Sequence, residues 1–256
     1  MAVPKRRGEI KLMRAAGRIL AEALELVREK AAAGVTTGQL DGLVEEAIRS
    51  RGAEPVFKGY TPSAAYGPYP ASICASVNEE VVHGIPGARQ LEEGDLLSVD
   101  VGVRHKNYCA DAAITVPIGR ISPEAQRLND VCRESLDLAI DAARANARVS
   151  DVSRAIQTYV EGQGYSVVRK YTGHGIGREL HEEPQVPNYV VRSPGARDTV
   201  LRPGITLAIE PMVNEGTHDT EVLSNRWTVV TADRKLSAHW EHTIAVSDGA
   251  ADVLTL

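Results

Sequence analysis

The sequence has few cysteines, no long apolar run and little excess charge, and each absence excludes a class of protein. Cys74, Cys109 and Cys132 are scattered and form no Cys-x-x-Cys pair, so they predict neither a disulfide framework nor a zinc knuckle. No apolar run approaches the roughly 20 residues of a membrane span, and no apolar segment follows the basic N-terminal residues as in a secretory signal. A net charge of −5 gives no argument for a nucleic-acid partner. We therefore expect a cytoplasmic protein that binds neither membranes nor nucleic acids.

The composition and the order of the predicted elements indicate an α+β protein. The 256 residues are 43% hydrophobic and 25% charged, which is ordinary for a globular protein and enough for one large domain or two intimate halves. Apolar spacing and capping signals predict helices at about residues 9–33, 37–52, 122–145 and 150–164. Strands follow each pair of helices, so the same order occurs in residues 1–120 and 121–256. We expect a single domain, residues 1–256, with two related halves and a cleft between them.

A predicted β-hairpin at residues 96–116 contains two aspartates. Alternating valines indicate the first strand, and the polar stretch 104–107 indicates a four-residue loop. If that loop is symmetric, Asp100 lies directly opposite Asp111 on one face, with Cβ atoms roughly 4.5–5.5 Å apart. A loop one residue longer would put them on opposite faces. Two facing carboxylates are unfavourable unless they share a proton, as an acid–base pair does, or bind a cation.

Three later segments add candidate metal ligands. His174 lies among three glycines, which let the backbone approach a ligand closely. Glu210 ends a predicted strand, and Glu241 interrupts an apolar and aromatic one. Four carboxylates with one imidazole suit Mn, Fe, Co or Mg better than an ion that prefers thiolates. They also balance the charge of two divalent ions, and such a pair can share a hydroxide nucleophile and polarise a carbonyl.

Six segments resemble the signature blocks of type I methionine aminopeptidases, in order and at similar spacing over nearly the whole chain. They read VNEEVVHGIP, SVDVG, YCADAA, GHGIGRELHEEP, IEPMV and AHWEHT. The resemblance implies the pita-bread fold, whose pseudo-symmetric halves surround a central cleft with two divalent metal ions, such as Co, Mn or Fe. It further implies that Asp100 holds one metal, that Asp111 and Glu241 bridge both, and that His174 and Glu210 hold the other.

The same resemblance implies catalytic and substrate-binding roles. His83 would contact the scissile amide and help to move a proton, and His181 would contact the scissile carbonyl and its developing oxyanion. Glu210 would relay a proton between the attacking water and the leaving amine. Residues that match the methionine pocket are Tyr66, Tyr69, Cys74 and Trp227. Two positions depart from the family pattern and bear on pocket shape: Leu180, where Phe is common, and Ser63, where some members have Cys.

The implied activity is removal of the initiator methionine from nascent polypeptides whose second residue is small. The short interval between Glu210 and Glu241 leaves no room for the helical insertion of type II enzymes. The sequence also begins at its first predicted helix, without the zinc-binding extension of eukaryotic type I members, so a compact bacterial-type enzyme is expected. No feature of the sequence requires an oligomer, so a monomer is expected. The basic residues 5–7 are expected to be solvated, and a ribosome-facing role for them has no support in the sequence.

Two other functions remain open from the sequence. Aminopeptidase P and prolidase share the implied fold and ligand types, but they usually have a further N-terminal domain. A non-enzymatic binding module on this fold would be expected to lack several ligands, and here all five are present together with both histidines. Among the remaining residues, Cys132 is expected in the core, His105 and His239 are expected to be structural or exposed, and His218 has no assigned role.

Overall fold

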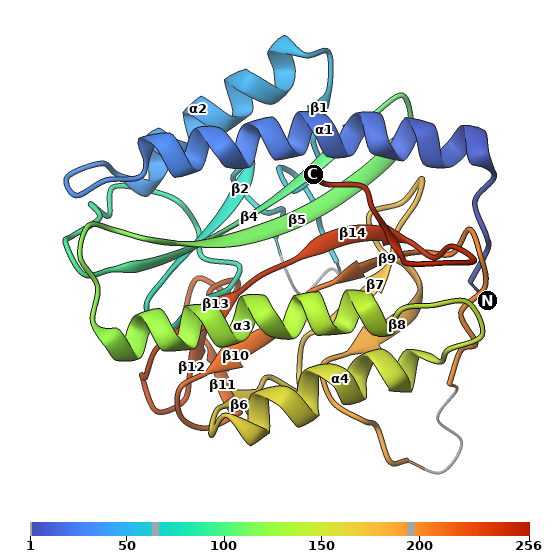
Figure 1. The fold of residues 1–256 in the computed structure, drawn as a ribbon. Coiled ribbons are helices and arrows are strands. Elements are labelled where there is room, and N and C mark those ends of the chain that lie inside the picture. Colours follow the sequence, from blue (N-terminus) through green and yellow to red (C-terminus); the bar gives the residue numbers. More distant parts are fainter. Residues whose placement is uncertain (1, 63–66, 194–197) are drawn as a thin grey trace.

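Two helices precede a group of strands, and this order occurs twice along the chain (Figure 1). The computed structural model describes residues 2–62, 67–193 and 198–256. The first group comprises α1 (Arg7–Lys30), α2 (Thr37–Ser50), β1 (Glu54–Pro55), β2 (Ile73–Val77), β3 (Glu80–Val82), β4 (Leu96–His105) and β5 (Tyr108–Pro117). The second comprises α3 (Pro123–Ala142), α4 (Val149–Gly162), β6 (Ser166–Val167), β7 (Thr172–Gly175), β8 (Glu182–Pro187), β9 (Thr206–Ile209), β10 (Met212–Asn214), β11 (Thr220–Val222), β12 (Val229–Thr231), β13 (Ser237–His239), β14 (His242–Ala245) and β15 (Asp252–Val253).

Capping side chains set the starts of α2 and α3, and the predicted helices are confirmed with small shifts at their ends. The Ser122 hydroxyl accepts a hydrogen bond from Ala125 N, and proline occupies the first turn of α3. Thr36, rather than the predicted Thr37, caps α2 and forms a capping box with Gln39. The predicted end of α1 at about residue 33 is wrong, because the helix stops at Lys30.

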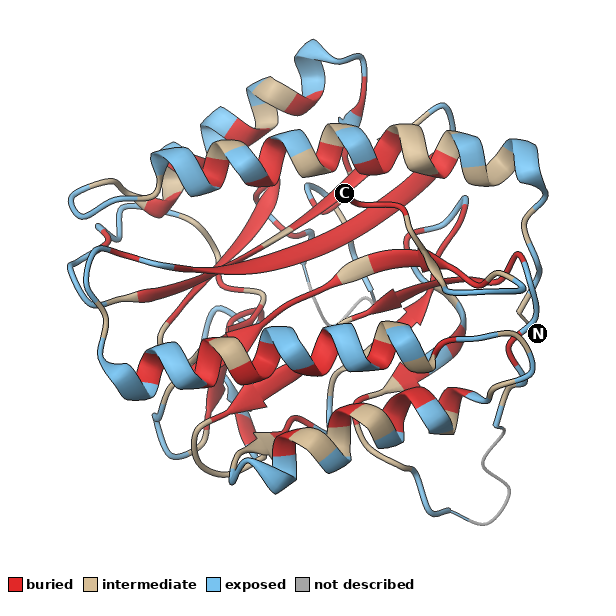
Figure 2. Cartoon of the chain, viewed as in Figure 1, coloured by how far each residue is buried: buried red, intermediate tan, exposed pale blue. Residues whose placement is uncertain are grey.

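The strands lie between the two helix pairs. One sheet has the order β1-β4-β2 with β5 on β4, and a five-stranded sheet has the order β15-β14-β9-β7-β8. The helix α1 packs on β4 and β5, while α3 and α4 lie on the opposite side of the molecule (Figure 1). The strands are largely buried and the outward helix faces are exposed (Figure 2). Among the described residues, we find no helix with the length and apolar character that a bilayer crossing requires.

The turn of the aspartate hairpin is shorter than predicted. Lys106 and Asn107 both adopt left-handed backbone conformations, with φ of 49° and 64°, and they alone connect β4 to β5. Left-handed conformations at both central positions form a tight two-residue turn that matches the twist of the strands. Arg104 and His105 therefore stay in β4, and the predicted four-residue loop is wrong.

The tighter turn also changes how the two aspartates face each other. Asp100 pairs with Ala113 and Asp111 pairs with Gly102, so the aspartates are diagonal neighbours and not directly opposite. Shortening the loop by two residues keeps the alternation of side chains, because successive residues of a strand point to opposite faces. The prediction that both carboxylates lie on one face is therefore confirmed, although the register differs from the predicted one.

Gly17 allows α1 to approach the C-terminal segment closely. A Cβ at Gly17 would lie 2.0 Å from the Leu254 carbonyl oxygen, whereas a Cβ at Gly42 on α2 would meet nothing within 4 Å. We expect Gly17→Ala to lower the free energy of unfolding by about 2–3 kcal/mol, because backbone must move. We expect Gly42→Ala to raise it by up to about 1 kcal/mol. Urea unfolding of both variants tests the contact, and a Gly17→Ala protein as stable as the parent would contradict it.

Candidate active site

Strands from different parts of the chain bring the five predicted metal ligands to one place. Asp100 and Asp111 lie on β4 and β5, His174 lies on β7, and Glu210 directly follows β9. Glu241 joins β13 to β14. All five side chains line one cavity. The sequence blocks that were predicted to hold a metal are therefore neighbours in the fold.

Backbone bonds fix the two halves of this cluster against each other. The backbone N–H of Glu241 donates to Ala113 O at 2.9 Å, and the Asp111 N–H donates to the Thr243 hydroxyl at 2.9 Å. The neighbouring strands β7 and β9 pair through His174 and Ala208. Each of these bonds lies within one or two residues of a candidate ligand. The ligand positions are thus set by strand pairing rather than by mobile loops.

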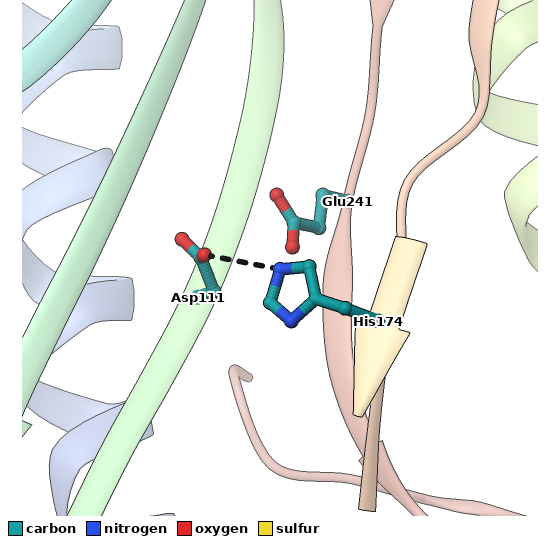
Figure 3. Close-up of side chains that lie close together, drawn as sticks. All are labelled: Asp111, His174 and Glu241. Carbon is teal, nitrogen blue, oxygen red and sulfur yellow. Dashed lines mark ion pairs between the residues drawn. The ribbon is translucent and has the colours of Figure 1, made fainter. Parts of the chain in front are cut away.

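Asp111, His174 and Glu241 form the centre of the cluster (Figure 3), with one ligand atom from each lying within 4.8 Å of the others. His174 Nε2 lies 3.8 Å from Asp111 Oδ2 and 3.6 Å from Glu210 Oε1. These separations are too long for direct hydrogen bonds. They leave room for a cation whose ligands would be oxygen atoms and one imidazole nitrogen.

Burial and mutual repulsion make the carboxylates difficult to ionise without a cation. Burial raises the pKa of Asp100 to about 7, and burial followed by repulsion from Glu241 and Asp100 raises the pKa of Asp111 well above its ordinary value. Within the described parts of the chain, Asp100 Oδ1, Asp111 Oδ1 and Glu241 Oε1 are buried without a hydrogen-bond partner. Unpaired buried carboxylates are costly, so the donor set fits a divalent metal.

The tautomer of His174 matches a metal ligand. Its Nδ1–H donates to Gly175 O at 2.9 Å, because a carbonyl oxygen can only accept. Burial lowers the pKa of His174 to about 3, so the ring is neutral near pH 7. Nε2 then presents a lone pair to the carboxylate side, which is the arrangement that metal-binding histidines use.

The cavity is about 180 Å³ in volume, and aromatic and apolar side chains line it together with the carboxylates and histidines of the cluster. Tyr69, Cys74 and Trp227 line it as predicted, and so does Leu180. The predicted pocket residue Tyr66 and the divergent Ser63 lie outside the described residues. Sequence reasoning missed three further lining residues: Phe57, Tyr60 and Pro62. The sequence marked their segment as a loop rich in Pro, Gly and Tyr, but it contains no signal that selects among its aromatics.

Tyr69 braces the wall of this cavity. Its hydroxyl shares its one proton between Ile73 O at 3.1 Å and Gly84 O at 2.8 Å, which ties β2 to the segment after β3. Its ring meets the Trp227 ring edge-on at 5.0 Å. Tyr69 is thus both a lining side chain and a support for its neighbours.

His83 occupies a strained position at the cavity. Its φ of 59° lies in the left-handed region, which a residue other than glycine adopts only when the surrounding structure holds it. The next residue provides that hold, since Gly84 N donates to Ser76 Oγ and Ala75 N donates to Gly84 O. Burial lowers the pKa of His83 to about 4, so its imidazole is neutral near pH 7. A neutral ring can accept or donate a proton at the cavity.

His181 lies beside His174, with ring centroids 4.2 Å apart. Its Nδ1 lies 2.9 Å from the Tyr60 hydroxyl. Burial lowers the pKa of His181 and raises that of Tyr60, so the imidazole is neutral and the phenol is protonated near pH 7. Both predicted histidines, His83 and His181, therefore reach the same cavity as the carboxylates.

His239 is buried next to the metal-ligand candidates. Its Nε2 lies 4.0 Å from both Glu210 Oε2 and Glu241 Oε2, and it has no hydrogen-bond partner among the described residues. Burial lowers its pKa to about 3. The sequence assigned His239 only a structural or exposed position. One sequence signal could have placed His239 at the site: it precedes Glu241 by two residues. Alternate residues of an extended chain point to the same side, so the two side chains are expected to share a face.

Residues 11–248 match metallopeptidase family M24, and the chain belongs to this family. It is 48% identical to a protein of Clostridium perfringens named methionine aminopeptidase, over 100% of this chain and 99% of that one. A crystal structure of methionine aminopeptidase from Thermotoga maritima superposes with a TM-score of 0.93 at 44% identity, covering 100% and 99% of the two chains. The predicted α+β pita-bread fold is confirmed.

A prolidase from Pyrococcus horikoshii shares the fold at lower similarity. Its TM-score is 0.79 at 22% identity, and the match covers 100% of this chain but 64% of the prolidase. At this identity the likeness concerns the fold alone. The relatives therefore favour methionine aminopeptidase over the prolidase alternative.

Proposed function

We propose that this protein is a metal-dependent aminopeptidase that removes the N-terminal methionine from polypeptides whose second residue is small. The observation that carries the proposal is the buried cluster of unpaired carboxylate oxygens and one imidazole, which opens into a small aromatic cavity. Family M24 is a metallopeptidase family, and the relative that matches at 48% identity is named methionine aminopeptidase. Fold, donor set and relatives all favour the same reaction class.

The residues that would hold the metal are the five that line the cluster: Asp100, Asp111, His174, Glu210 and Glu241. We propose that these residues would hold two divalent ions, Co, Mn or Fe, and that Asp111 and Glu241 would be among the ligands at the centre of the cluster. Two ions match the charge of four carboxylates, and the single imidazole fits this class of metal. When bound, such ions polarise a carbonyl and lower the pKa of water.

Side chains of this protein would orient the substrate and move protons. His83 would contact the scissile amide, and its neutral imidazole can pass a proton near pH 7. His181 would donate a hydrogen bond to the scissile carbonyl oxygen, where negative charge develops in the transition state. Glu210 lines the cavity with the other candidate ligands, and its carboxylate would accept a proton from the attacking water and deliver it to the leaving amine.

The cavity wall would bind the methionine side chain. Tyr69, Cys74 and Trp227 present aromatic and thiol surface to a space of about 180 Å³. A flexible thioether fills irregular apolar space well and makes favourable contacts with aromatic rings. Tyr66 is proposed as a further member on the basis of sequence alone. The physiological partners would be the N-termini of nascent polypeptides. The protein would act as a monomer with a single domain, in the cytoplasm.

Peptide cleavage tests this function against the prolidase alternative. We expect the metal-loaded protein to release methionine from Met-Ala-Ser and to leave Ala-Pro-Ala intact, because the cavity selects the first side chain. Free methionine and free alanine are measured by chromatography after incubation with each peptide. Cleavage of Ala-Pro-Ala alone would favour the prolidase activity, and cleavage of neither peptide would contradict an aminopeptidase function.

A further inference from the structure

Two adjacent histidines at the candidate site have hydrogen-bond partners of opposite character. His174 and His181 are separated by 4.2 Å between ring centroids, with 51° between the ring planes. Nδ1 of His174 faces the carbonyl oxygen of Gly175, which can only accept a hydrogen bond. Nδ1 of His181 faces the hydroxyl of Tyr60, which can donate one. The tautomer of a neutral imidazole is set by the partner of its other nitrogen.

We infer that Tyr60 is a positioning residue that holds His181 in the tautomer with its proton on Nε2. The Tyr60 hydroxyl donates to the unprotonated Nδ1 of His181 at 2.9 Å. His181 then has an Nε2–H donor for the cavity that its ring lines, whereas the neighbouring His174 has an Nε2 lone pair. The hydrogen bond at Nδ1 thus leaves His181 as a donor at Nε2, and it leaves His174 able to bind a metal through Nε2. This inference deepens the proposed function, because it rests on His181 donating to the scissile carbonyl oxygen.

The opposite arrangement is less favourable for both groups. If Nδ1–H of His181 donated to the phenol oxygen, the phenol proton would lose its acceptor on His181 and would have to turn to solvent at this exposed contact. A phenol is also a stronger donor than a neutral imidazole N–H, and an imidazole nitrogen is a stronger acceptor than a phenol oxygen. Within the described parts of the chain, Nε2 of His181 has no hydrogen-bond partner of its own. It is therefore free to meet a carbonyl oxygen in the cavity.

The backbone around Tyr60 holds its ring against His181. Tyr60 N donates to Phe57 O at 2.9 Å, and Tyr60 O accepts from Tyr69 N at 2.9 Å. A second bond from Gly59 N to Tyr69 O, at 2.8 Å, completes this pairing. The rings of Tyr60 and His181 lie 5.3 Å apart between centroids. A hydroxyl at this position is thus fixed relative to the cavity wall.

The test combines a conservative substitution with a direct reading of the tautomer. Tyr60→Phe removes the hydroxyl and keeps the ring, and Tyr159→Phe removes a hydroxyl on α4 that bonds Glu134 away from the site. We expect Tyr60→Phe to lower kcat on Met-Ala-Ser about tenfold with KM within about twofold of the parent, since orientation and tautomer matter mainly in the transition state. We expect Tyr159→Phe to match the parent in both constants.

Nitrogen-15 NMR of the histidine rings gives the readout that a merely structural role would not change. In the protein loaded with a diamagnetic divalent metal, His181 should show a protonated Nε2 and a hydrogen-bonded, unprotonated Nδ1, assigned by loss of its signals in His181→Gln. In Tyr60→Phe the two nitrogen shifts should move toward each other as the second tautomer becomes populated. A parent His181 that holds its proton on Nδ1 would overturn the inference, and this reading needs no variant at Tyr60. Unchanged shifts and kcat in Tyr60→Phe would also overturn it.

The two proposals fail in different ways. If the parent protein released no methionine while His181 showed the expected tautomer, the proposed function would be wrong and the hydrogen-bond assignment correct. If the parent released methionine and His181 showed the opposite tautomer, the role of Tyr60 would be wrong and the aminopeptidase function would stand.

Discussion

Replacing Asp111 with asparagine is expected to lower methionine release by roughly a thousandfold or more while leaving the metal-free protein at least as stable as the parent. Asp111 lies near Glu241 in the cluster, and repulsion from Glu241 and Asp100 adds to burial in raising its pKa. A neutral amide of the same shape removes that repulsion when no cation is present, and we expect a gain of about 1 kcal/mol. It also removes a charged ligand, so metal binding and activity fall together.

The two effects of Asp111→Asn are measured separately. Thermal melting of the metal-free proteins reports the repulsion, and calorimetric titration with Mn²⁺ reports the affinity. Asp130→Asn on α3, whose carboxylate accepts from Gln126 on the same helix, is the matched control and should match the parent in activity and metal affinity. Metal-free Asp111→Asn that melts well below the parent would contradict the repulsion among the carboxylates, and Mn²⁺ binding as tight as in the parent would contradict the assignment of Asp111 as a metal ligand.

Replacing His83 with asparagine is expected to lower kcat by about 10²–10³-fold while metal affinity stays unchanged. His83 is not among the candidate ligands, and its neutral imidazole lines the cavity where a proton must move. Asparagine is chosen because it tolerates the left-handed backbone at this position, where φ is 59°. Substrate turnover and metal binding should therefore separate in this variant, whereas they fall together in Asp111→Asn.

The control for His83 is His218→Asn, in the loop between β10 and β11, where the imidazole lies 3.4 Å from the Asp219 carboxylate. We expect this variant to match the parent in kcat and in Mn²⁺ affinity. A His83→Asn protein whose kcat stays within about twofold of the parent would show that His83 has no part in proton transfer. Loss of Mn²⁺ binding in the same variant would instead make His83 part of the metal site.

Local signals made much of the fold predictable, and they indicated the carboxylates and the histidine that the fold brings together. The Ser122 cap and the proline after it are specific for a helix start, and the helix begins there. Asp100 and Asp111 were predicted to share a face from an assumed four-residue loop, and they do so because the observed two-residue turn is shorter by an even number of residues. Their exact partners were not predictable, since the two-residue turn depends on Lys106 and Asn107 both adopting positive φ. Neither residue is glycine, so the sequence contained no strong signal for that turn.

Features that depend on contacts between distant segments were missed. Tyr60 reaches His181 because backbone bonds to Tyr69 and Phe57 fix its place, and nothing in a loop rich in tyrosines indicates which ring points inward. His239 was assigned a structural or exposed position, as a lone histidine usually is, but strand β13 turns it toward Glu210 and Glu241. Tyr60 lies far from His181 in the sequence, and His239 lies far from Glu210, so only the folded chain brings these groups together.

The most direct test of the central claim follows methionine release as metal is returned to the stripped protein. Chelated protein is titrated with Mn²⁺ or Co²⁺, and methionine released from Met-Ala-Ser is measured against metal bound per chain. We expect no release from the stripped protein, and release that rises with bound metal and saturates when the cluster is filled. Methionine release that persists undiminished in protein free of divalent metal would contradict a metal centre at Asp111, His174 and Glu241.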